Sequence, residues 1–377
     1  MPYIRVSTQI KKIIILNAVG IGDVLMVTPT IRRIREEMPA VHISALVLSR
    51  SAYQILETCP YVDKVIYVDP NIRHNISHKM RVLFSLRRQK FDVSITVFGA
   101  NKMRYNLLAW MIGARYRITF NYPIKKFKMP FLQNIKVDFL PKHEVLLNLS
   151  LLIPIGIKSK PPNGLEIWLT GEDIALSQRW LKVNDIRLTH QIIGIHPGSS
   201  ILRKMVYKRW PIQNFVNLCQ LITKVETQIK ILIFCGPQEA QIKKIFTSLA
   251  IPSVVVVSDL RIRETAALIK KCSLFISNDS GLMHIAAALK VPVVALFGPT
   301  DTKIVGPYGT PNIIIKRDFT CRPCWSSETY GQIPDCRCMV PYDCIRGITV
   351  IDVFKTIKGM DCKIPGDERQ SAPTLTT

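Results

Sequence analysis

The sequence predicts an α/β protein built from two doubly wound lobes, and three observations indicate this. Short runs rich in Ile and Val alternate with helical patterns, and the runs are apolar almost throughout, as in parallel strands buried on both faces. A Lys-, Pro- and Gly-rich stretch, 158–164, interrupts the alternation near the middle of the 377 residues. The alternation then restarts, so we expect two lobes with a cleft between them.

The pattern gives the order of elements in each lobe. Before the interruption we expect strands over 12–16, 42–48, 64–68 and 92–98, and helices over 28–38, 51–58, 75–89 and 102–112. After it we expect strands over 191–195, 229–235, 253–257, 273–277 and 291–297, and helices over 172–182, 212–224, 238–248, 263–271 and 280–289. Beyond 312 the sequence predicts a short strand, a cysteine-rich loop and a helix over 349–358. The expected domains are therefore 1–160 and 165–358, followed by a flexible tail, 359–377.

The balance of charge favours a polyanionic partner. Lys and Arg total 51 against 27 Asp and Glu, a formal net charge of +24. Over 71–140 there are 14 Lys and Arg against Asp92 and Asp138, so half of the excess falls in this region. Anionic lipid headgroups, a phosphorylated glycolipid and nucleic acid all suit such a face, and a solvated surface without a partner is the alternative. No zinc finger, RNP-type strand or basic heptad accompanies the charge, so we expect no nucleic acid.

The sequence shows no membrane-spanning or targeting segment. The most hydrophobic helical stretch, 145–157, contains polar residues and Pro154 and is too short to span a bilayer. Near the N-terminus only four apolar residues, 13–16, follow Lys11 and Lys12, which does not make a signal peptide. We therefore expect a cytoplasmic protein, in which cysteines are thiols or metal ligands more often than disulfides.

The segment 275–299 has the pattern of a phosphate-binding turn. It reads as a buried strand, a polar turn of Asn278, Asp279, Ser280 and Gly281, then a helix and a second buried strand. Backbone N–H groups and the positive end of the helix dipole meet at such a turn. His284, four residues after Ser280, lies on the same helix face. The alternative is an ordinary helix cap with a packed histidine.

The first strand runs into a glycine-rich turn that contains Gly20, Gly22 and Asp23. The turn departs from the dinucleotide fingerprint, because Leu25 replaces the third glycine and the next strand carries no acidic residue. A dehydrogenase is therefore disfavoured. What the turn offers is close approach of the backbone to a ligand, and a carboxylate at the mouth of the sheet. The alternative is that Asp23 only caps the following helix, which begins at Gly22 or at Pro29.

Two further polar loops follow strands of the second lobe. Strand 191–195 ends in His196-Pro-Gly-Ser199-Ser, and Lys204 and Lys208 follow it. Cations beside a turn of small residues are what a departing diphosphate needs. Strand 229–235 leads to Glu239 at a helix start, where the carboxylate would bind a ribose or complement the helix dipole.

Taken together, these motifs resemble the family 9 glycosyltransferases, the heptosyltransferases that build the inner core of bacterial lipopolysaccharide. The resemblance covers about 12–355, and its motifs are Gly-Ile-Gly-Asp23, Thr28-Pro29, His-Pro-Gly-Ser199, Lys208-Arg-Trp-Pro211, Cys-Gly-Pro-Gln-Glu239, Asn-Asp279-Ser-Gly-Leu-Met-His284 and Leu-Phe-Gly-Pro-Thr300. It implies a GT-B fold of two Rossmann-like domains, an acceptor domain followed by a nucleotide-sugar donor domain. It also implies an inverting reaction with ADP-heptose and no catalytic metal.

The resemblance also implies roles for single residues. Asp23 would be the general base, beside the acceptor-side glycines Gly20 and Gly22, and Lys208 would neutralise the departing diphosphate. The donor would be bound by these residues: His196, Ser199, Glu239 (at the ribose), Asp279, Ser280, Gly281 and His284. The stretch between Ser200 and Lys208 is longer and more basic than is usual in the family, so Lys204 would share the phosphate role with Lys208 or take it over.

We therefore expect transfer of heptose from ADP-heptose to a phosphorylated lipid A–Kdo acceptor, at the inner face of the inner membrane, with the protein held peripherally on the anionic membrane surface. One alternative is a related transferase with another nucleotide sugar or a non-lipopolysaccharide acceptor. Another is a non-catalytic nucleotide-sugar-binding protein, against which the intact Asp23, Lys208 and His284 argue.

A cysteine cluster lies near the C-terminus. Cys321, Cys324, Cys338 and Cys344 fall within 321–344 and suit tetrahedral zinc or iron, with Cys336 as the alternative to Cys338. We expect such a metal to be structural.

Overall fold

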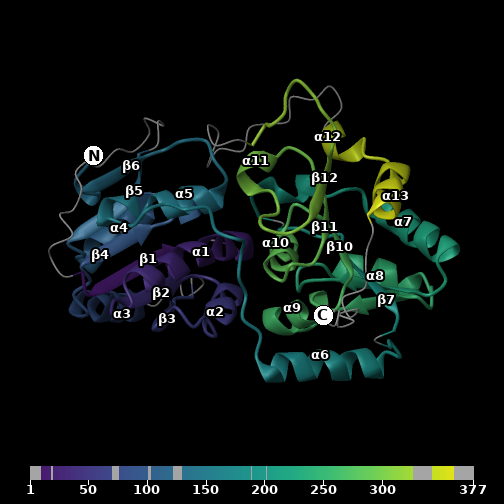
Figure 1. Cartoon of the computed structure of the whole chain (residues 1–377), viewed down its shortest axis with the longest axis horizontal. Coiled ribbons are helices and arrows are strands. Elements are labelled where there is room, and N and C mark those ends of the chain that lie inside the picture. Colours follow the sequence, from purple (N-terminus) through teal and green to yellow (C-terminus); the bar gives the residue numbers. More distant parts are fainter. Residues whose placement is uncertain are drawn as a thin grey trace, which may run out of the picture.

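The computed structural model describes residues 10–17, 20–69, 76–100, 103–121, 130–187, 189–200, 202–325 and 342–360; within these, the side chains of 76, 78, 130 and 202–204 are not described. The chain forms two lobes that lie side by side, each with one parallel sheet (Figure 1). The predicted α/β architecture of two doubly wound sheets is therefore confirmed. Apart from Gly359 and Met360, the predicted tail lies outside the described residues.

The first lobe contains a six-stranded sheet in the order β3-β2-β1-β4-β5-β6, in which every neighbouring pair is parallel. Its elements are β1 (Lys12–Asn17), α1 (Ile21–Glu37), β2 (His42–Val47), α2 (Arg50–Leu56), β3 (Lys64–Tyr67), α3 (Ile76–Arg88), β4 (Val93–Thr96), η1 (Phe98–Ala100), α4 (Met103–Ile112), β5 (Tyr116–Asn121), η2 (Pro130–Leu132), β6 (Ile135–Asp138), α5 (Glu144–Ser150) and η3 (Ile153–Ile155).

The second lobe repeats this strand order along its own sequence, β12-β11-β10-β7-β8-β9, and is again parallel. Its elements are α6 (Gly171–Val183), β7 (Gln191–His196), η4 (Leu202–Lys208), α7 (Ile212–Val225), β8 (Ile229–Phe234), α8 (Ala240–Ser248), β9 (Val254–Val257), α9 (Ile262–Ile269), β10 (Leu274–Asn278), α10 (Gly281–Ala288), β11 (Val293–Phe297), α11 (Thr302–Val305), β12 (Asn312–Lys316), α12 (Asp343–Arg346) and α13 (Val350–Gly359).

The first lobe differs from the sequence prediction in two places. Helix α1 begins at Ile21 and not at 28, because Gly20 is extended and serves as N-cap while Pro29 is accommodated inside the helix. Strands β5 and β6 were not predicted, and helix α5 ends at Ser150, well before the end of the helical stretch 145–157 recognised in the sequence. The burial of β6 alternates from residue to residue, as expected for a strand at the edge of the sheet, whereas the central strands are buried throughout.

Two helical layers cover the first sheet, and they have different neighbours. Helices α3 and α4 cover one face through Leu86, Ala109 and Ile112, which pack with Ile14 and Leu16 of β1. Helices α1, α2 and α5 lie on the side that faces the second lobe (Figure 1). The first lobe therefore has an inner layer against its partner lobe and an outer layer away from it.

The connection between the lobes is pinned to both of them. The Glu166 backbone N–H donates to Thr28 Oγ1 (3.1 Å), and Thr58 Oγ1 donates to the Trp168 carbonyl (2.9 Å) in the first lobe. On the other side, Lys290 Nζ donates to the Asn163 carbonyl (2.9 Å). Among the described residues, no helix combines the length and the apolar character that crossing a bilayer requires.

Candidate functional site

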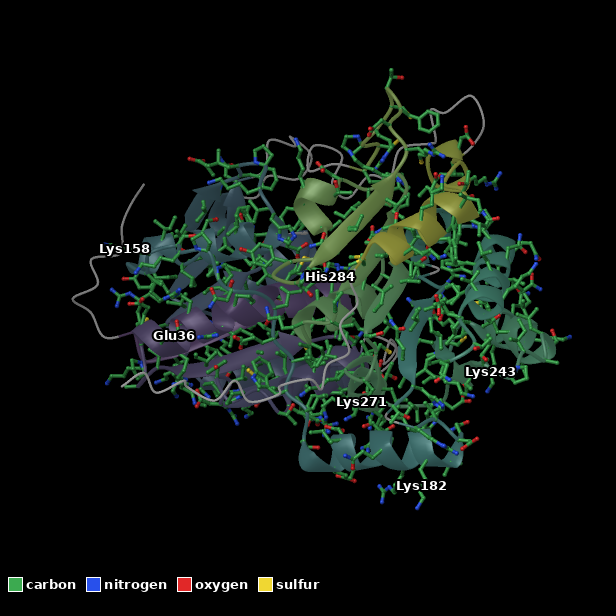
Figure 2. The ribbon with its side chains drawn as sticks, turned by 45° about the vertical axis from the view of Figure 1, so that its right-hand side comes forward. Glu36, Lys158, Lys182, Lys243, Lys271 and His284 are labelled. Atoms are coloured by element: carbon green, nitrogen blue, oxygen red, sulfur yellow. The ribbon has the colours of Figure 1, made fainter. Side chains whose placement is uncertain are left out.

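The N-termini of α1 and α10 meet between the lobes. A β-carbon placed on Gly281 would lie 2.9 Å from Cβ of Ile21, and one placed on Gly22 would lie 2.7 Å from Cδ2 of His284. Figure 2 shows His284 near the middle of the molecule. Both glycines are therefore required for the close approach of the two helices. Because each helix follows the carboxyl end of a central strand, the meeting point lies where the sequence predicts the site.

Asp23 is the third residue of α1 and points back toward the start of its helix. Its Oδ2 accepts a hydrogen bond from the Gly20 backbone N–H (3.0 Å), so the carboxylate does cap the helix, as the alternative interpretation proposes. Burial raises the pKa of Asp23 above its ordinary value, although the Gly20 hydrogen bond and the charge of Lys208 oppose this effect. Asp23 thus interacts electrostatically with Lys208 and Asp279 of the other lobe.

Lys208 forms a close ion pair with Asp279. Its Nζ lies 2.6 Å from Asp279 Oδ2, and the two side chains are only 13% and 6% exposed. The ammonium group also lies 5.6 Å from the centre of the Trp325 ring. Lys208 ends η4 and Asp279 follows β10, so the pair joins two loops at the carboxyl edge of the second sheet. The side chain of Lys204 lies outside the described residues.

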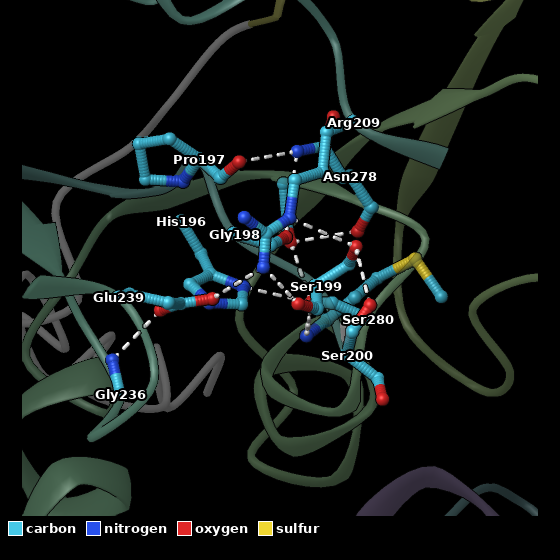
Figure 3. A network of polar contacts seen from close by, with 12 residues as sticks. His196, Pro197, Gly198, Ser199, Ser200, Arg209, Gly236, Glu239, Asn278 and Ser280 are labelled. Atoms are coloured by element: carbon cyan, nitrogen blue, oxygen red, sulfur yellow. Dashed lines mark hydrogen bonds and ion pairs between the residues drawn. The ribbon is translucent and has the colours of Figure 1, made fainter. Parts of the chain in front are cut away.

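Around this pair the polar side chains of the second lobe are held by one another (Figure 3). His196 Nδ1 lies 2.8 Å from Ser280 Oγ, which also accepts from the Met283 backbone N–H (3.4 Å) as the N-cap of α10. Asn278 Nδ2 donates to the Pro197 carbonyl (2.7 Å). The hydroxyl of Ser280 is therefore committed to protein partners.

Ser199 and Arg209 tie η4 to the loop that follows β7. The Ser199 hydroxyl donates to the Met205 carbonyl (3.0 Å), and Arg209 Nη2 donates to the Ser199 carbonyl. Asn278 Oδ1 accepts from the Trp210 backbone N–H (2.9 Å), which fixes the next residue of the chain. Together these bonds hold the loop that ends in Lys208.

Glu239 is buried, with 6% of its surface exposed, beside His196. Its Oε2 accepts from the Gly236 backbone N–H (2.7 Å) and lies 3.3 Å from His196 Nε2. Burial alone would raise the pKa of Glu239, but His196, the Gly236 N–H and Arg209 together lower it. A β-carbon on Gly198 would lie 1.6 Å from Glu239 Oε1, so only glycine fits there. Glu239 is therefore a fixed anion at the mouth of β8.

His284 is a neutral imidazole near pH 7. Burial lowers its pKa to about 4, so the ring is uncharged near pH 7 in this structure. Its Nδ1 is buried and finds no hydrogen-bond partner among the described side chains and backbone. Any contact with a donor would be a hydrogen bond from a neutral ring.

His143, at the start of α5, was not predicted from the sequence. Its Nδ1 accepts from the Val145 backbone N–H (3.3 Å), which places the ring proton on Nε2. Nε2 then donates to the Gly306 carbonyl of the second lobe (3.0 Å), and burial lowers the pKa of His143. The ring therefore holds the lobes together in its neutral form.

Glu144, the next residue, is a second carboxyl group that the sequence did not reveal. It is 1% exposed, and its Oε1 has no hydrogen-bond partner among the described residues. Its pKa lies well above the ordinary value because burial disfavours the charged form, and the nearby Asp23 adds to the effect; a hydrogen bond from Asn148 opposes it. A glutamate at the start of a helix is normally expected at the surface, where it complements the helix dipole. The sequence around Glu144 therefore gave no sign that this side chain is buried.

The raised pKa of Glu144 predicts a pH-dependent stability difference. As pH rises above the ordinary value of 4.5, the unfolded chain loses this proton before the folded chain does, so the charge of Glu144 costs the folded state stability. Glu144→Gln cannot ionise and keeps an acceptor for Asn148. We expect wild type and Glu144→Gln to melt alike at about pH 4, and the variant to melt higher at about pH 8. A melting-temperature difference that is the same at both pH values would contradict this.

The described cysteines of the predicted cluster gather near the end of β11. Cys324 precedes Trp325, which pairs with Thr300, and Cys344 Sγ lies 3.7 Å from a β-carbon placed on Gly298. Cys321 is half-buried, and its carbonyl lies 3.1 Å from Cys324 Sγ. Cys336 and Cys338 lie outside the described residues. Within the described part of the chain, no group of three or more His, Cys, Asp or Glu side chains is arranged to hold a metal.

The ends of this cysteine segment contact the chain at Lys208. Trp325 lies beneath the Lys208 ammonium, and the rings of Tyr207 and Tyr342 stack with their centres 3.9 Å apart. The Trp210 indole N–H donates to the Ile348 carbonyl just beyond (2.8 Å). Trp325 and Tyr342, the described residues on either side of 326–341, thus both contact residues 207–208.

Comparison with known proteins agrees with this architecture. The model of glycosyltransferase family 9 (heptosyltransferase) matches residues 80–332. The chain is 25% identical over 307 residues to lipopolysaccharide heptosyltransferase 3 of Escherichia coli K12, covering 78% of this chain and 84% of that protein. It is 24% identical over 325 residues to lipooligosaccharide heptosyltransferase 2 of Campylobacter jejuni, covering 83% and 89%.

Solved structures show the same fold. A family 9 glycosyl transferase from Veillonella parvula superposes with a TM-score of 0.76 at 23% identity, covering 93% of this chain and 97% of that one. ADP-heptose lps heptosyltransferase II of E. coli superposes with a TM-score of 0.70 at 19% identity, covering 92% and 97%. The two lobes are thus those of a GT-B fold. Because the family model spans more than half of the chain, the protein belongs to glycosyltransferase family 9 and is a glycosyltransferase.

Proposed function

We propose that the protein transfers heptose from ADP-heptose to a lipopolysaccharide inner-core acceptor of the lipid A–Kdo type, with inversion at the anomeric carbon. The observation that carries this proposal is the placement of Asp23. Its carboxyl group, held by the first lobe, lies within electrostatic reach of Lys208 and Asp279 of the second lobe. A base on one lobe and a cation on the other are what a displacement at a sugar phosphate requires.

In this mechanism Asp23 removes the proton of the attacking hydroxyl. A sugar hydroxyl is a weak nucleophile until a base takes its proton, and a positioned carboxylate contributes about 10²–10⁴-fold. The raised pKa of Asp23 makes it a stronger base than an exposed aspartate. The hydroxyl oxygen bonds to the anomeric carbon while the carbon–oxygen bond to the diphosphate breaks on the opposite face, and the proton stays on Asp23.

The departing diphosphate takes up negative charge that the second lobe stabilises. Lys208 is the nearest cation, and the first turn of α10, at Gly281, presents backbone N–H groups and the positive end of the helix dipole. Asp279 and Ser280 are held by Lys208 and His196 in the structure, so their proposed part is to orient the site around the donor. Neutral His284 would donate a hydrogen bond, and Glu239 would accept from the ribose.

The two lobes would divide the substrates between them. We propose that residues 1–160 form the acceptor domain and 165–358 the donor domain. Relatives support ADP as the donor nucleotide, since E. coli heptosyltransferase structures have been solved with ADP and with ADP-2-deoxy-2-fluoro heptose, with TM-scores of 0.68 and 0.65. A lipid-linked acceptor implies action at the inner face of the inner membrane, with the protein attached peripherally to the anionic surface.

The test is transfer by the purified full chain. ADP-heptose and deacylated lipid A–Kdo acceptor are incubated with the protein, ADP release is measured, and the product is identified by mass and by the anomeric configuration in its NMR spectrum. We expect one heptose per acceptor with inverted configuration. ADP-glucose and UDP-N-acetylglucosamine serve as control donors. Absence of ADP release in the presence of acceptor would refute the proposal, and preference for another donor would correct the sugar.

We also propose that the cysteine segment holds one structural zinc or iron ion through Cys321, Cys324, Cys344 and either Cys336 or Cys338. The gathering of Cys324 and Cys344 at the end of β11 supports this. A structural neighbour, the iron-containing dodecameric glycosyltransferase TibC of enterotoxigenic E. coli, superposes with a TM-score of 0.57. The ion would fasten the segment and supply no step of transfer.

Elemental analysis tests the metal proposal. We expect one equivalent of zinc or iron per chain in protein purified without chelator, and loss of the metal with a lower melting temperature in Cys324→Ser. A wild-type preparation without stoichiometric metal would end the proposal, whatever its activity.

A further inference from the structure

The outer helical layer of the first lobe exposes large apolar side chains. Seven such side chains are exposed in the described part of this lobe, and six of them lie on α3, α4 and η2: Met80, Phe84, Met103, Leu107, Trp110 and Phe131. Trp110 is 46% exposed and Phe131 60% exposed, and their rings pack edge to face with centres 6.2 Å apart. We call these six residues the α3–α4 face.

Helical spacing places these side chains on continuous stripes. Met103, Leu107 and Trp110 follow one another at i, i+4 and i+7 on α4, while Met80 and Phe84 are four apart on α3. The opposite sides of both helices are buried against the sheet through Leu86, Ala109 and Ile112. Arg87 Nη1 joins the helices by donating to the Met111 carbonyl (3.0 Å). The two stripes therefore face outward together.

The charge around the α3–α4 face is positive and uncompensated. Over 76–117 the sequence has nine Lys and Arg and a single acidic residue, Asp92. Asp92 accepts hydrogen bonds from the backbone N–H groups of Lys11 and Lys12 (2.7 and 2.9 Å). In the described part of the chain, the exposed cations of α3 and α4, namely Lys79, Arg81, Arg87, Arg88 and Arg104, form no ion pair with a carboxylate.

The inner layer of the same lobe is different. There Arg32 lies 2.6 Å from Glu36, and Arg35 Nη2 lies 2.6 Å from Asp63 Oδ2. Among the described residues, carboxylates thus pair with cations of α1, whereas the cations of α3 and α4, the helices that also expose apolar side chains, have no such partner. Aromatic and aliphatic side chains within a basic rim are the composition that seats an amphipathic surface in the headgroup region of an anionic bilayer.

We propose that the α3–α4 face is a membrane-docking surface that inserts Leu107, Trp110 and Phe131 among the headgroups of anionic lipids, while the cations of α3 and α4 bind the lipid phosphates. This rests on the proposed function in that a lipid-linked acceptor brings the protein to a bilayer. We propose anionic lipid as the partner because the cations of α3 and α4 are complementary to its phosphate groups.

The placement of the helices connects docking with the site. α3 and α4 both begin at the carboxyl edge of the first sheet, which is the edge at which Asp23 follows β1. Met103 is the first residue of α4 and Met80 the fifth of α3, so both lie in the half of their helix nearer that edge. A bilayer on the α3–α4 face would therefore lie beside the carboxyl edge that carries Asp23, on the side of the first lobe away from the second lobe (Figure 1).

The experiment measures binding of the full chain to sucrose-loaded vesicles by co-sedimentation, with no sugar present. Vesicles contain phosphatidylcholine alone or with phosphatidylglycerol. We expect binding to the anionic vesicles that weakens with added salt, and little binding to neutral ones. The double variant Leu107→Ser/Trp110→Ser should lower the partition coefficient about tenfold or more, since two large side chains lose their apolar insertion.

A matched control removes equally exposed apolar side chains from the second lobe. Val183 is 85% and Ile351 51% exposed, so Val183→Ser/Ile351→Ser should bind as wild type does. Melting curves establish that both double variants are folded. Equal vesicle binding by wild type and Leu107→Ser/Trp110→Ser, or an equal loss in the control, would overturn the proposal. Binding to neutral vesicles as strong as to anionic ones would overturn the role of the cations.

The docking proposal and the proposed transferase function can be tested independently of each other. With a deacylated, water-soluble acceptor, Leu107→Ser/Trp110→Ser should turn over at the wild-type rate, while transfer to vesicle-embedded acceptor should fall with binding. Vesicle binding without any transfer would remove the proposed function and leave the docking surface. Transfer to the soluble acceptor without vesicle binding would remove the docking surface alone.

Discussion

Asp23→Asn should lower the rate of heptose transfer by about 10²–10⁴-fold while leaving the binding of ADP-heptose unchanged. Asparagine has nearly the same shape, and its side-chain carbonyl can still accept the Gly20 N–H, so the start of α1 is kept. It cannot take a proton from the acceptor hydroxyl. Single-turnover transfer and calorimetric donor binding, measured on the same preparation, separate the two effects.

A control for Asp23 comes from another helix start. Asp352 occupies the same capping position in α13, where its Oδ2 accepts from the Thr349 backbone N–H (3.0 Å), and it is remote from the site. Asp352→Asn should leave transfer unchanged. In wild type, transfer should increase with pH as Asp23 loses its proton, with a midpoint above the ordinary aspartate value of 3.8. Near-normal turnover by Asp23→Asn would refute its role as base.

Lys208→Ala should reduce transfer by about 10²–10³-fold and weaken donor binding, because the departing diphosphate loses its nearest cation. It should also destabilise the fold. Asp279, only 6% exposed, is left without its partner at 2.6 Å, and breaking such a buried pair costs about 3–5 kcal/mol. Steady-state kinetics and denaturant unfolding measure the two losses.

A second substitution separates the structural part from the chemical part. Lys208→Ala/Asp279→Asn removes the unpaired carboxylate, so stability should return while transfer stays low. A double variant that regained wild-type transfer would show that Lys208 acts only by satisfying Asp279. The surface pair Lys243–Asp259, also 2.6 Å apart, provides the control, because both side chains are well exposed and Lys243→Ala should change neither stability nor transfer.

The fold followed from the sequence wherever strands are buried on both faces. The runs 13–16 in β1 and 274–276 in β10 are apolar without interruption, and glycine-rich or polar turns mark the carboxyl ends of these strands. Strands β5 and β6 escaped prediction because they carry charges between their apolar residues, as Lys136 lies between Ile135 and Val137. A search for period-two alternation would have found β6. Helix α1 starts where it does because Gly20 is extended and acts as the N-cap. The sequence did not decide between this start and one at Pro29, since proline is also common at the first position of a helix.

For the candidate site, the sequence predicted which loops carry the polar residues but not how these residues contact one another. Sequence reasoning placed Asp23, Lys208 and Asp279 at carboxyl ends of strands, and a shared edge then brings them together. It could not tell that Lys208 and Asp279 are partners, because their pairing depends on the path of η4. Nor could it find Glu144, whose burial arises from the packing of α5 on α1 and not from its own neighbours in the sequence.

Because Trp325 and Tyr342 contact residues 207–208, the position of the Lys208 ammonium depends on how these two aromatic side chains are placed. Any shift of Trp325 or Tyr342 would carry residues 207–208 with it, because the Lys208 ammonium lies over the Trp325 ring and Tyr342 stacks on Tyr207. Selection for faster or slower turnover can therefore act on Trp325 and Tyr342, through packing alone, without replacing Lys208 itself.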